Sequence, residues 1–372
     1  MRNQSRLARH VLVAVAVGIG LAAAPATQAL ANPACGSVIT SSVTLTSDLN
    51  CTGNALIVGA AGITVDLGGY NVIGTGTGTG VQVGSYANDV TVTNGGISGF
   101  ATGVFVTASK RAILSNLAVQ NGVGIKVQNG NDTHVNGGSV TSGSVQVALS
   151  TGVQFNGVAL DHAPLTATSS NSFLFDLGSA TDGSVSISQS NTVKLTNSTF
   201  TRAPIAYSST SQGGLFQNDT IQGAGVGLVI DPTGFGAQIL GNTFSGNGIG
   251  VKTRVSDLAT ITGTNISGNN FTGNTAAGVL FEVSATTSTS VATVSGNTFD
   301  GNGFTGGVSD RLGRPVADGL HFATVSGAKV TVKNNTALNN ASYGVFADAG
   351  SVIDGGGNTS TGDPSGCAGV TC

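Results

Sequence analysis

The sequence contains no tryptophan, and only 5% of its 372 residues are aromatic. Charged residues make up 8% of the chain, whereas an ordinary soluble domain carries about a quarter. The surface must therefore be covered by serine, threonine, asparagine and glycine. Because tryptophan is absent, the ring on which sugars most often stack is missing too.

Basic side chains are also scarce, and three of them lie at the very start of the chain. Three arginines precede an apolar run from Val11 to Ala24, and Ala29-Leu30-Ala31 follows. This is the order of a cleavable secretory signal, and the run is shorter than the roughly 20 residues of a membrane-spanning helix. We expect residues 1–31 to be removed and the protein to be secreted, with no membrane attachment afterwards. The remaining 11 basic and 17 acidic side chains carry a net charge of about −6, which disfavours nucleic acid as a partner.

A short unit recurs along the rest of the chain, and it decides the fold. A small residue is followed by apolar residues at alternate positions, as in Gly80-Val81-Gln82-Val83, Gly103-Val104-Phe105-Val106 and Gly278-Val279-Leu280-Phe281. Copies lie about 20 to 28 residues apart, with one spacing near 41. A second unit, of the type Asn242-Thr243-Phe244 with Asn247, lies between them.

Strands this short cannot bury a face alone, so they must stack on copies of themselves. The period leaves room for two or three strands per turn, joined by bends where glycine and asparagine accept a positive φ. Equivalent asparagines are expected to form amide ladders along the stack. We therefore predict an all-β protein, a single-stranded right-handed parallel β-helix of roughly 12–13 turns. A β-sandwich of short strands is the alternative, but it leaves the repeated Asn-Phe offsets unexplained.

The predicted organisation has four parts. Residues 1–31 are the secretory signal, 32–61 an N-terminal cap and first turn, 62–357 the β-helix, and 358–372 a C-terminal tail. The two ends of such a stack lie tens of ångströms apart, because each turn adds about 4.8 Å. Since bridged Cα atoms must lie within about 7 Å, the predicted disulfides join neighbouring cysteines at each end, Cys35 with Cys51 and Cys367 with Cys372.

The pattern Asn-x-Phe-x-Gly-Asn followed by Gly-Val resembles the β-helix repeat of the pectin-lyase-like superfamily. The segment from Cys35 through Thr64-Val65-Asp66-Leu67-Gly68-Gly69-Tyr70 is similar to the start of secreted bacterial members. The resemblance covers residues 36–357 and implies the fold more strongly than a function, because this fold supports lyases, hydrolases, epimerases and non-catalytic proteins. It implies an extracellular or cell-wall polysaccharide as partner, bound on an outward sheet face.

The catalytic motifs of these enzymes are not found in this sequence. The signatures of polygalacturonase-like members are absent, and the closest match to the Asp-Pro-His element of alginate epimerases is Asp231-Pro232-Thr233. No tight group of carboxylates supports a calcium site, so we predict neither a metal nor a cofactor, and calcium stays open as the alternative.

The outward positions of the repeat change from neutral to charged toward the C-terminus. Asp231, Arg254 and Glu282 occupy one outward column, and Lys252 and His321 occupy the next. The long spacing corresponds to a loop between Asn302 and Gly319, whose charged residues are Asp310, Arg311, Arg314 and Asp318. We expect loop and columns to form a groove for a glycan, with Arg254 or His321 transferring protons.

Simpler interpretations of these charges stay open. The columns are equally consistent with an exposed salt-bridge ladder, worth less than about 1 kcal/mol per pair. A weaker second candidate site is Asp161-His162 with Arg202, which lies two turns later. Two functions remain: a secreted protein that binds or modifies polysaccharide, with lyase or hydrolase chemistry as its sharpest form, and a non-catalytic extracellular structural or adhesin-like protein. The sequence specifies no oligomeric state.

Overall fold

A computed structural model describes residues 32–208, 211–230, 236–255, 263–283, 291–324 and 329–372. Within these ranges, the side chains of residues 254, 255, 283, 291, 324 and 329 are not described. The predicted signal, residues 1–31, lies outside the described residues. No helix in the part of the chain described here has the length and apolar character needed to span a membrane.

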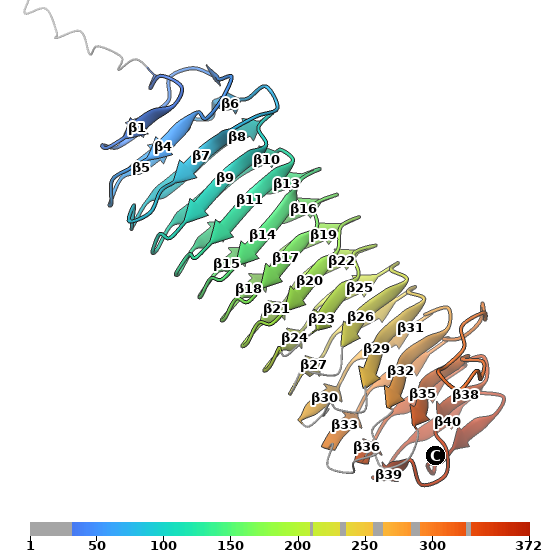
Figure 1. Ribbon diagram of the computed structural model, residues 1–372. Coiled ribbons are helices and arrows are strands. Elements are labelled where there is room, and N and C mark those ends of the chain that lie inside the picture. The colour runs from blue at the N-terminus through green and yellow to red at the C-terminus, as the bar shows by residue number, and fades with distance from the viewer. Residues whose placement is uncertain (1–31, 209–210, 231–235, 256–262, 284–290, 325–328) are drawn as a thin grey trace, which may run out of the picture. The chain divides into compact units, whose positions relative to one another are not determined.

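The described chain coils into stacked turns, each built from short strands that pair in parallel with the next turn (Figure 1). One strand of every turn joins sheet A, which has 15 strands. Sheet A contains β1 (Ser37–Ile39), β4 (Leu56–Val58), β7 (Thr79–Val83), β9 (Thr102–Thr107), β11 (Val123–Gln128), β14 (Ser144–Ala148), β17 (Leu165–Thr168), β20 (Val185–Ser188), β23 (Ile205–Ser208), β26 (Val226–Ile230), β29 (Ile249–Val255), β32 (Ala277–Val283), β35 (Asp318–Thr324), β38 (Tyr343–Phe346) and β41 (Gly366–Ala368).

The other strands form sheet B, which has two columns. The first column contains β2 (Val43–Thr44), β5 (Thr64–Asp66), β8 (Thr91–Ser98), β10 (Ile113–Gln120), β12 (His134–Asn136), β15 (Gln154–Asn156), β18 (Leu174–Asp176), β21 (Lys194–Thr196), β24 (Leu215–Gln217), β27 (Gln238–Leu240), β30 (Thr264–Ser267), β33 (Val291–Ser295), β36 (Lys329–Lys333) and β39 (Val352–Asp354). The second contains β3 (Leu49–Asn50), β6 (Asn71–Ile73), β13 (Ser139–Thr141), β16 (Ala159–Asp161), β19 (Ser179–Thr181), β22 (Thr199–Thr201), β25 (Thr220–Gln222), β28 (Thr243–Ser245), β31 (Asn270–Thr272), β34 (Thr298–Asp300), β37 (Thr336–Leu338) and β40 (Thr359–Thr361). The longer strands β8 and β10 pair with both columns.

This architecture confirms the predicted right-handed parallel β-helix. Every pairing between named strands is parallel, which excludes a β-sandwich built from hairpins. Apolar residues alternate along each strand and point into the coil, where they form one continuous core. Phe244, Phe271 and Phe299 stack in this core with ring centroids 4.9 and 5.0 Å apart.

Asparagines stabilise the bends between strands in two ways. At the bend between the two columns of sheet B, Asn116 and Asn197 themselves adopt a positive φ of 51° and 52°. Farther along, a buried ladder runs through Asn242, Asn269 and Asn297, each of whose amide nitrogens donates to the side-chain oxygen of the next turn's asparagine at 3.0 Å. The predicted amide ladders are therefore confirmed.

Both predicted disulfides are present. Cys35 bonds to Cys51 and Cys367 to Cys372, with Cα atoms 5.6 and 6.1 Å apart. At the C-terminal end the stack extends beyond the predicted boundary, because β40 and β41 continue it into the segment 358–372 that was expected to be a tail. Sheet A thus has more strands than 12–13 turns require. The sequence rule missed the terminal turns because their strands have only two or three residues each.

Candidate functional site

The outward face of sheet A carries polar, mostly uncharged side chains over its middle turns. Between inward residues such as Val145 and Val147, the outward residues are partly exposed. From β7 to β23 the outward column includes Gln82, Phe105, Lys126, Gln146, Thr166, Ser186 and Ala206, and its neighbour includes Thr107, Gln128, Ala148, Thr168, Ser188 and Ser208. Hydroxyl and amide groups therefore line up from turn to turn.

The same face is covered farther along by the inserted loop, residues 303–318. The loop folds back on itself, with a bridge between Ser309 and Pro315. Its Val316 packs on Ile249, Ala277 and Leu280, which form an apolar cluster separate from the core inside the coil. The repeat sends Leu280 outward, and the loop shields it from water.

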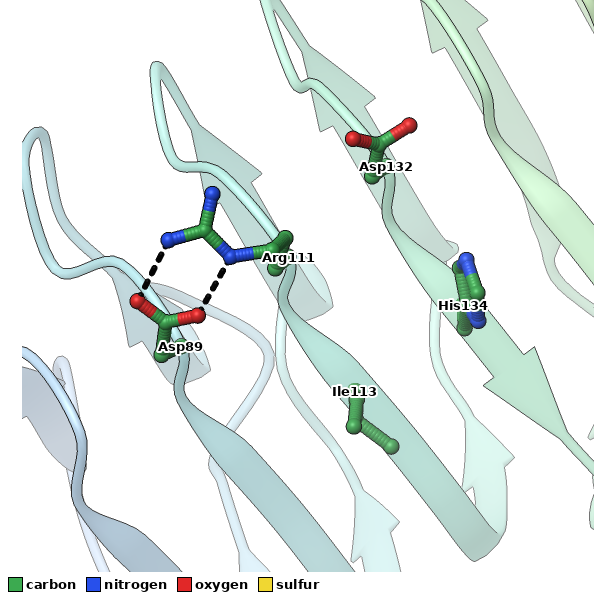
Figure 2. A pocket seen from close by; sticks show the side chains of 5 residues that line it. All are labelled: Asp89, Arg111, Ile113, Asp132 and His134. Atoms are coloured by element: carbon green, nitrogen blue, oxygen red, sulfur yellow. Dashed lines mark hydrogen bonds and ion pairs between the residues drawn. The ribbon is translucent and has the colours of Figure 1, made fainter.

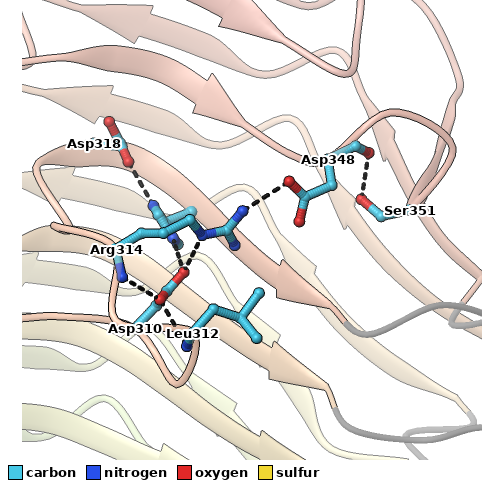
Figure 3. Close-up of polar contacts among 7 residues, drawn as sticks. Asp310, Leu312, Arg314, Asp318, Asp348 and Ser351 are labelled. Carbon is cyan, nitrogen blue, oxygen red and sulfur yellow. Dashed lines mark hydrogen bonds and ion pairs between the residues drawn. The ribbon is translucent and has the colours of Figure 1, made fainter.

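A network of charged side chains fastens this loop to sheet A (Figure 3). His321 Nδ1 lies 2.6 Å from Asp318 Oδ2, and His321 Nε2 lies 3.1 Å from Asp310 Oδ2. Arg314 donates from Nε to Asp310 at 2.7 Å and from Nη1 to Asp348 at 2.7 Å. The Phe346 ring stacks on His321 with centroids 4.8 Å apart, and the Arg314 guanidinium lies 4.9 Å from the same ring.

Asp310 is the centre of this network. Burial on its own raises the pKa of a carboxyl group, but hydrogen bonds from the Arg314 backbone, the His321 and Arg314 side chains and the Leu312 backbone outweigh it. Together they lower the pKa of Asp310 to about 2. The carboxylate therefore stays charged and keeps its partners at any ordinary pH.

The exposure of His321 differs from the sequence expectation. Its strand position is the outward one, paired with Leu280 and Phe346, but its side chain is only 2% exposed because the inserted loop covers it. Asp310 and Asp318 are buried with it. In this arrangement His321 contacts the inserted loop and lies beneath it, not on an open groove.

The structure describes only part of the predicted column of Asp231, Arg254 and Glu282. Glu282 forms an ion pair with Lys252, whose Nζ lies 3.2 Å from Oε2, and both side chains are mostly covered. The backbone of Arg254 pairs with that of Glu282, but its side chain, like all of Asp231, lies outside the described residues. Arg311 is exposed, and its side chain forms no hydrogen bond or ion pair within the described part of the chain.

The second candidate, Asp161-His162 with Arg202, gains a member that sequence analysis missed. Asp182 lies between them at the same bend and receives two bonds from Arg202, at 2.5 and 2.6 Å. His162 lies 2.8 Å from Asp161 and 3.8 Å from Asp182. Within the described residues, Asp161, His162 and Asp182 form a group whose possible metal-ligand atoms all lie within 4.8 Å of one another. Asp161 and His162 are exposed, and Asp182 is partly exposed. Because Arg202 already occupies both oxygens of Asp182, we interpret the group as a surface ion-pair cluster.

Comparison with known proteins supports the fold. Residues 183–366 match the sequence model of the family described as the right handed beta helix region, which confirms the predicted repeat class. No curated protein sequence matches the chain.

Among solved structures, the chain is similar to the A-module of the mannuronan C-5 epimerase AlgE4 of Azotobacter vinelandii. That match has 13% identity and a TM-score of 0.42, and it covers 88% of this chain and 89% of the other. A second is PfbA, a surface adhesin of Streptococcus pneumoniae, with 10% identity, a TM-score of 0.38 and coverage of 82% and 83%. A third is a mannuronic acid specific polysaccharide family 6 lyase from human gut microbiota, with 8% identity, a TM-score of 0.35 and coverage of 81% of each chain.

Proposed function

We propose that this protein is exported and binds an extracellular polysaccharide along the outward face of sheet A. The observation that carries the proposal is the run of hydroxyl and amide side chains, exemplified by Gln146, Thr166 and Ser186, on successive turns of one flat face. Hydroxyl and amide groups both donate and accept hydrogen bonds, as the hydroxyl groups of a sugar do. Adjacent turns of a parallel sheet lie about 4.8 Å apart, so an extended chain laid across the strands meets a new set of partners at each turn.

Two further features support this assignment. Phe105 is partly exposed on the same face, with the Lys126 ammonium 5.1 Å from its ring centroid, so the face offers one aromatic surface beside a cation. The inserted loop packs on the outward face of sheet A at β29, β32 and β35. It covers one end of the row of outward polar side chains, which we call the strip. A bound chain would therefore lie over the turns that precede the loop.

Binding without turnover is the form of this function that we favour. Of the two residues expected to transfer protons, His321 is buried by the loop. The second candidate function is that of a non-catalytic extracellular structural or adhesin-like protein, and the burial of His321 agrees with it too.

The test removes three hydrogen-bonding side chains of the strip at once. Gln146→Ala, Thr166→Ala and Ser186→Ala are combined in one variant, and affinity electrophoresis against neutral and acidic polysaccharides measures binding. The matched control combines Gln154→Ala, Thr181→Ala and Ser179→Ala, which are the same residue types on the outward faces of sheet B. Three lost hydrogen bonds should weaken binding by about tenfold or more in the first variant and leave the control unchanged. Equal binding by both variants contradicts the proposal, and so does the absence of binding by the unaltered protein to every polysaccharide.

A further inference from the structure

A separate pocket lies on the bend that leads from sheet A into sheet B. Asp89, Arg111 and Asp132 occupy the same place on three successive turns, with positive φ values of 57°, 55° and 54°. Arg111 donates from Nε and Nη2 to the two oxygens of Asp89 at 2.5 and 2.7 Å (Figure 2). This bidentate pair orients the guanidinium group in a fixed plane along the bend.

The pocket has a volume of about 450 Å³ and is lined by these three residues together with Ile113 and His134. Ile113 and His134 lie opposite each other in β10 and β12, both on the outward face of sheet B. Ile113 is 38% exposed, so it presents an apolar surface to the pocket. The pocket therefore has an apolar floor, a ring at one side and charged groups along the bend.

Several polar groups of the pocket are free to form further hydrogen bonds. Neither Asp132 nor His134 has a side-chain hydrogen bond or ion pair within the described part of the chain, and Nη1 of Arg111 has none there either. Gly152 follows Asp132 on the next turn, and a Cβ there would lie 2.4 Å from Asp132 Oδ1. Glycine at this position leaves the Asp132 carboxylate the room it occupies beside the pocket.

These groups fit the two sides of a sugar ring. The C–H face of a hexose is apolar and suits Ile113 and the His134 ring, while a pair of neighbouring hydroxyl groups can donate to both oxygens of one carboxylate. Two carboxylates and one guanidinium line the pocket, so their summed charge is negative and disfavours the carboxylate of an acidic sugar.

We propose that this pocket binds the ring of a neutral hexose. Asp132 accepts from two neighbouring hydroxyl groups, Nη1 of Arg111 donates to a third oxygen, and Ile113 and His134 contact the apolar face. The site lies on a different strand column from the strip of sheet A, so it does not depend on the function proposed above.

The imidazole NMR signals provide a direct test, because residues 32–372 contain three histidines, His134, His162 and His321. D-glucose, D-galactose and D-mannose are titrated into the protein, with D-glucuronate as the charged counterpart. We expect a saturable shift of the His134 signal with at least one neutral hexose, a much weaker response to D-glucuronate, and no shift of His162.

The matched variants are Asp132→Asn and Asp161→Asn, each at an exposed aspartate beside a histidine. Asparagine readily adopts a positive φ, so Asp132→Asn keeps the bend while it removes the charged acceptor. Asp132→Asn should weaken the binding seen at His134 by about tenfold or more, and Asp161→Asn should leave it unchanged.

Three results would overturn the proposal: no saturable His134 shift with any of the three hexoses up to their solubility limits, an equal shift at His162, or full binding by Asp132→Asn. Failure of this site and failure of the sheet A strip are distinguishable. The triple alanine variant of sheet A should keep the His134 response, and Asp132→Asn should keep the polysaccharide affinity of sheet A.

Discussion

His321 Nε2 lies 3.1 Å from Asp310 Oδ2, and this contact joins a strand of sheet A to a loop that interrupts the repeat. Because Asp318 holds the opposite nitrogen of the same imidazole, the ring lies between two buried carboxylates. One side chain thus ties the beginning of β35 to the far side of the inserted loop.

The first prediction concerns this fastening. His321→Ala removes both carboxylate contacts and the stacking on Phe346, so residues 303–318 should open more often while the coil beneath stays folded. Trypsin cleavage after Arg311 measures the opening, because Arg311 is exposed and the bond after Arg314 precedes a proline. We expect cleavage at Arg311 to accelerate by more than about tenfold.

His162→Ala is the control for this experiment, since His162 is also next to carboxylates but is 62% exposed. It should leave the cleavage rate at Arg311 unchanged. If His321→Ala and the unaltered protein are cleaved at the same rate, the imidazole does not hold the loop.

The sequence predicts the repeating strand that carries His321 better than it predicts the inserted loop, because only the strand follows the periodic pattern. The alternation in Gly319-Leu320-His321-Phe322 correctly predicts that His321 points away from the core, because a strand permits only two directions. It does not predict the burial of His321, because that depends on contacts such as the one with Asp310, in a loop with no repeat partner. Nothing in a non-repeating loop indicates from the sequence which surface it will cover.

The bends between strands also contain residues that the sequence analysis did not find. The sequence analysis paired His162 with Arg202 two turns later but missed Asp182 on the turn between them, although the three positions follow one another at intervals of 20 residues. The series Asp89, Arg111 and Asp132, which also lies at bend positions on successive turns, was missed as well. A comparison of bend positions at the repeat spacing would have found both groups, because residues with positive φ also align from turn to turn.

A second prediction tests the amide ladder. Asn297 accepts from the backbone and side-chain nitrogens of Asn269 and donates to Ile266 and to Asn335. Asn297→Ala leaves these buried groups without partners, so the free energy of unfolding should fall by about 2–4 kcal/mol. Urea unfolding followed by circular dichroism measures the loss.

Asn270→Ala provides the matched control, because Asn270 begins β31 one residue after a ladder position but is exposed. Its effect should stay within about 0.5 kcal/mol. Comparable losses in the two variants would mean that the ladder adds nothing specific to stability.

The final prediction concerns the one turn at which an aspartate continues this ladder. Asp219 is 1% exposed; its Oδ1 accepts from the Ser198 backbone at 2.9 Å, and its backbone nitrogen donates to Asn242 at 2.8 Å. Its Oδ2 occupies the place where later turns have a donating NH₂ group, and it has no partner in the described residues. Burial, only partly offset by backbone hydrogen bonds, raises the pKa of Asp219 to about 7.

Since the folded-state pKa exceeds the unfolded value of about 3.9, the folded protein binds the extra proton between these two values. The stability of the unaltered protein should therefore fall as the pH rises from about 4 through about 7. Asp219→Asn supplies the missing donor without a charge, so it should raise the free energy of unfolding by a few kcal/mol at pH ~8 and much less at pH ~4. Urea unfolding at both pH values measures the difference, with the exposed substitution Asp161→Asn as control. If Asp219→Asn destabilises the protein at the higher pH, the carboxyl group is charged and satisfied there, and the ladder does not need an amide at this turn.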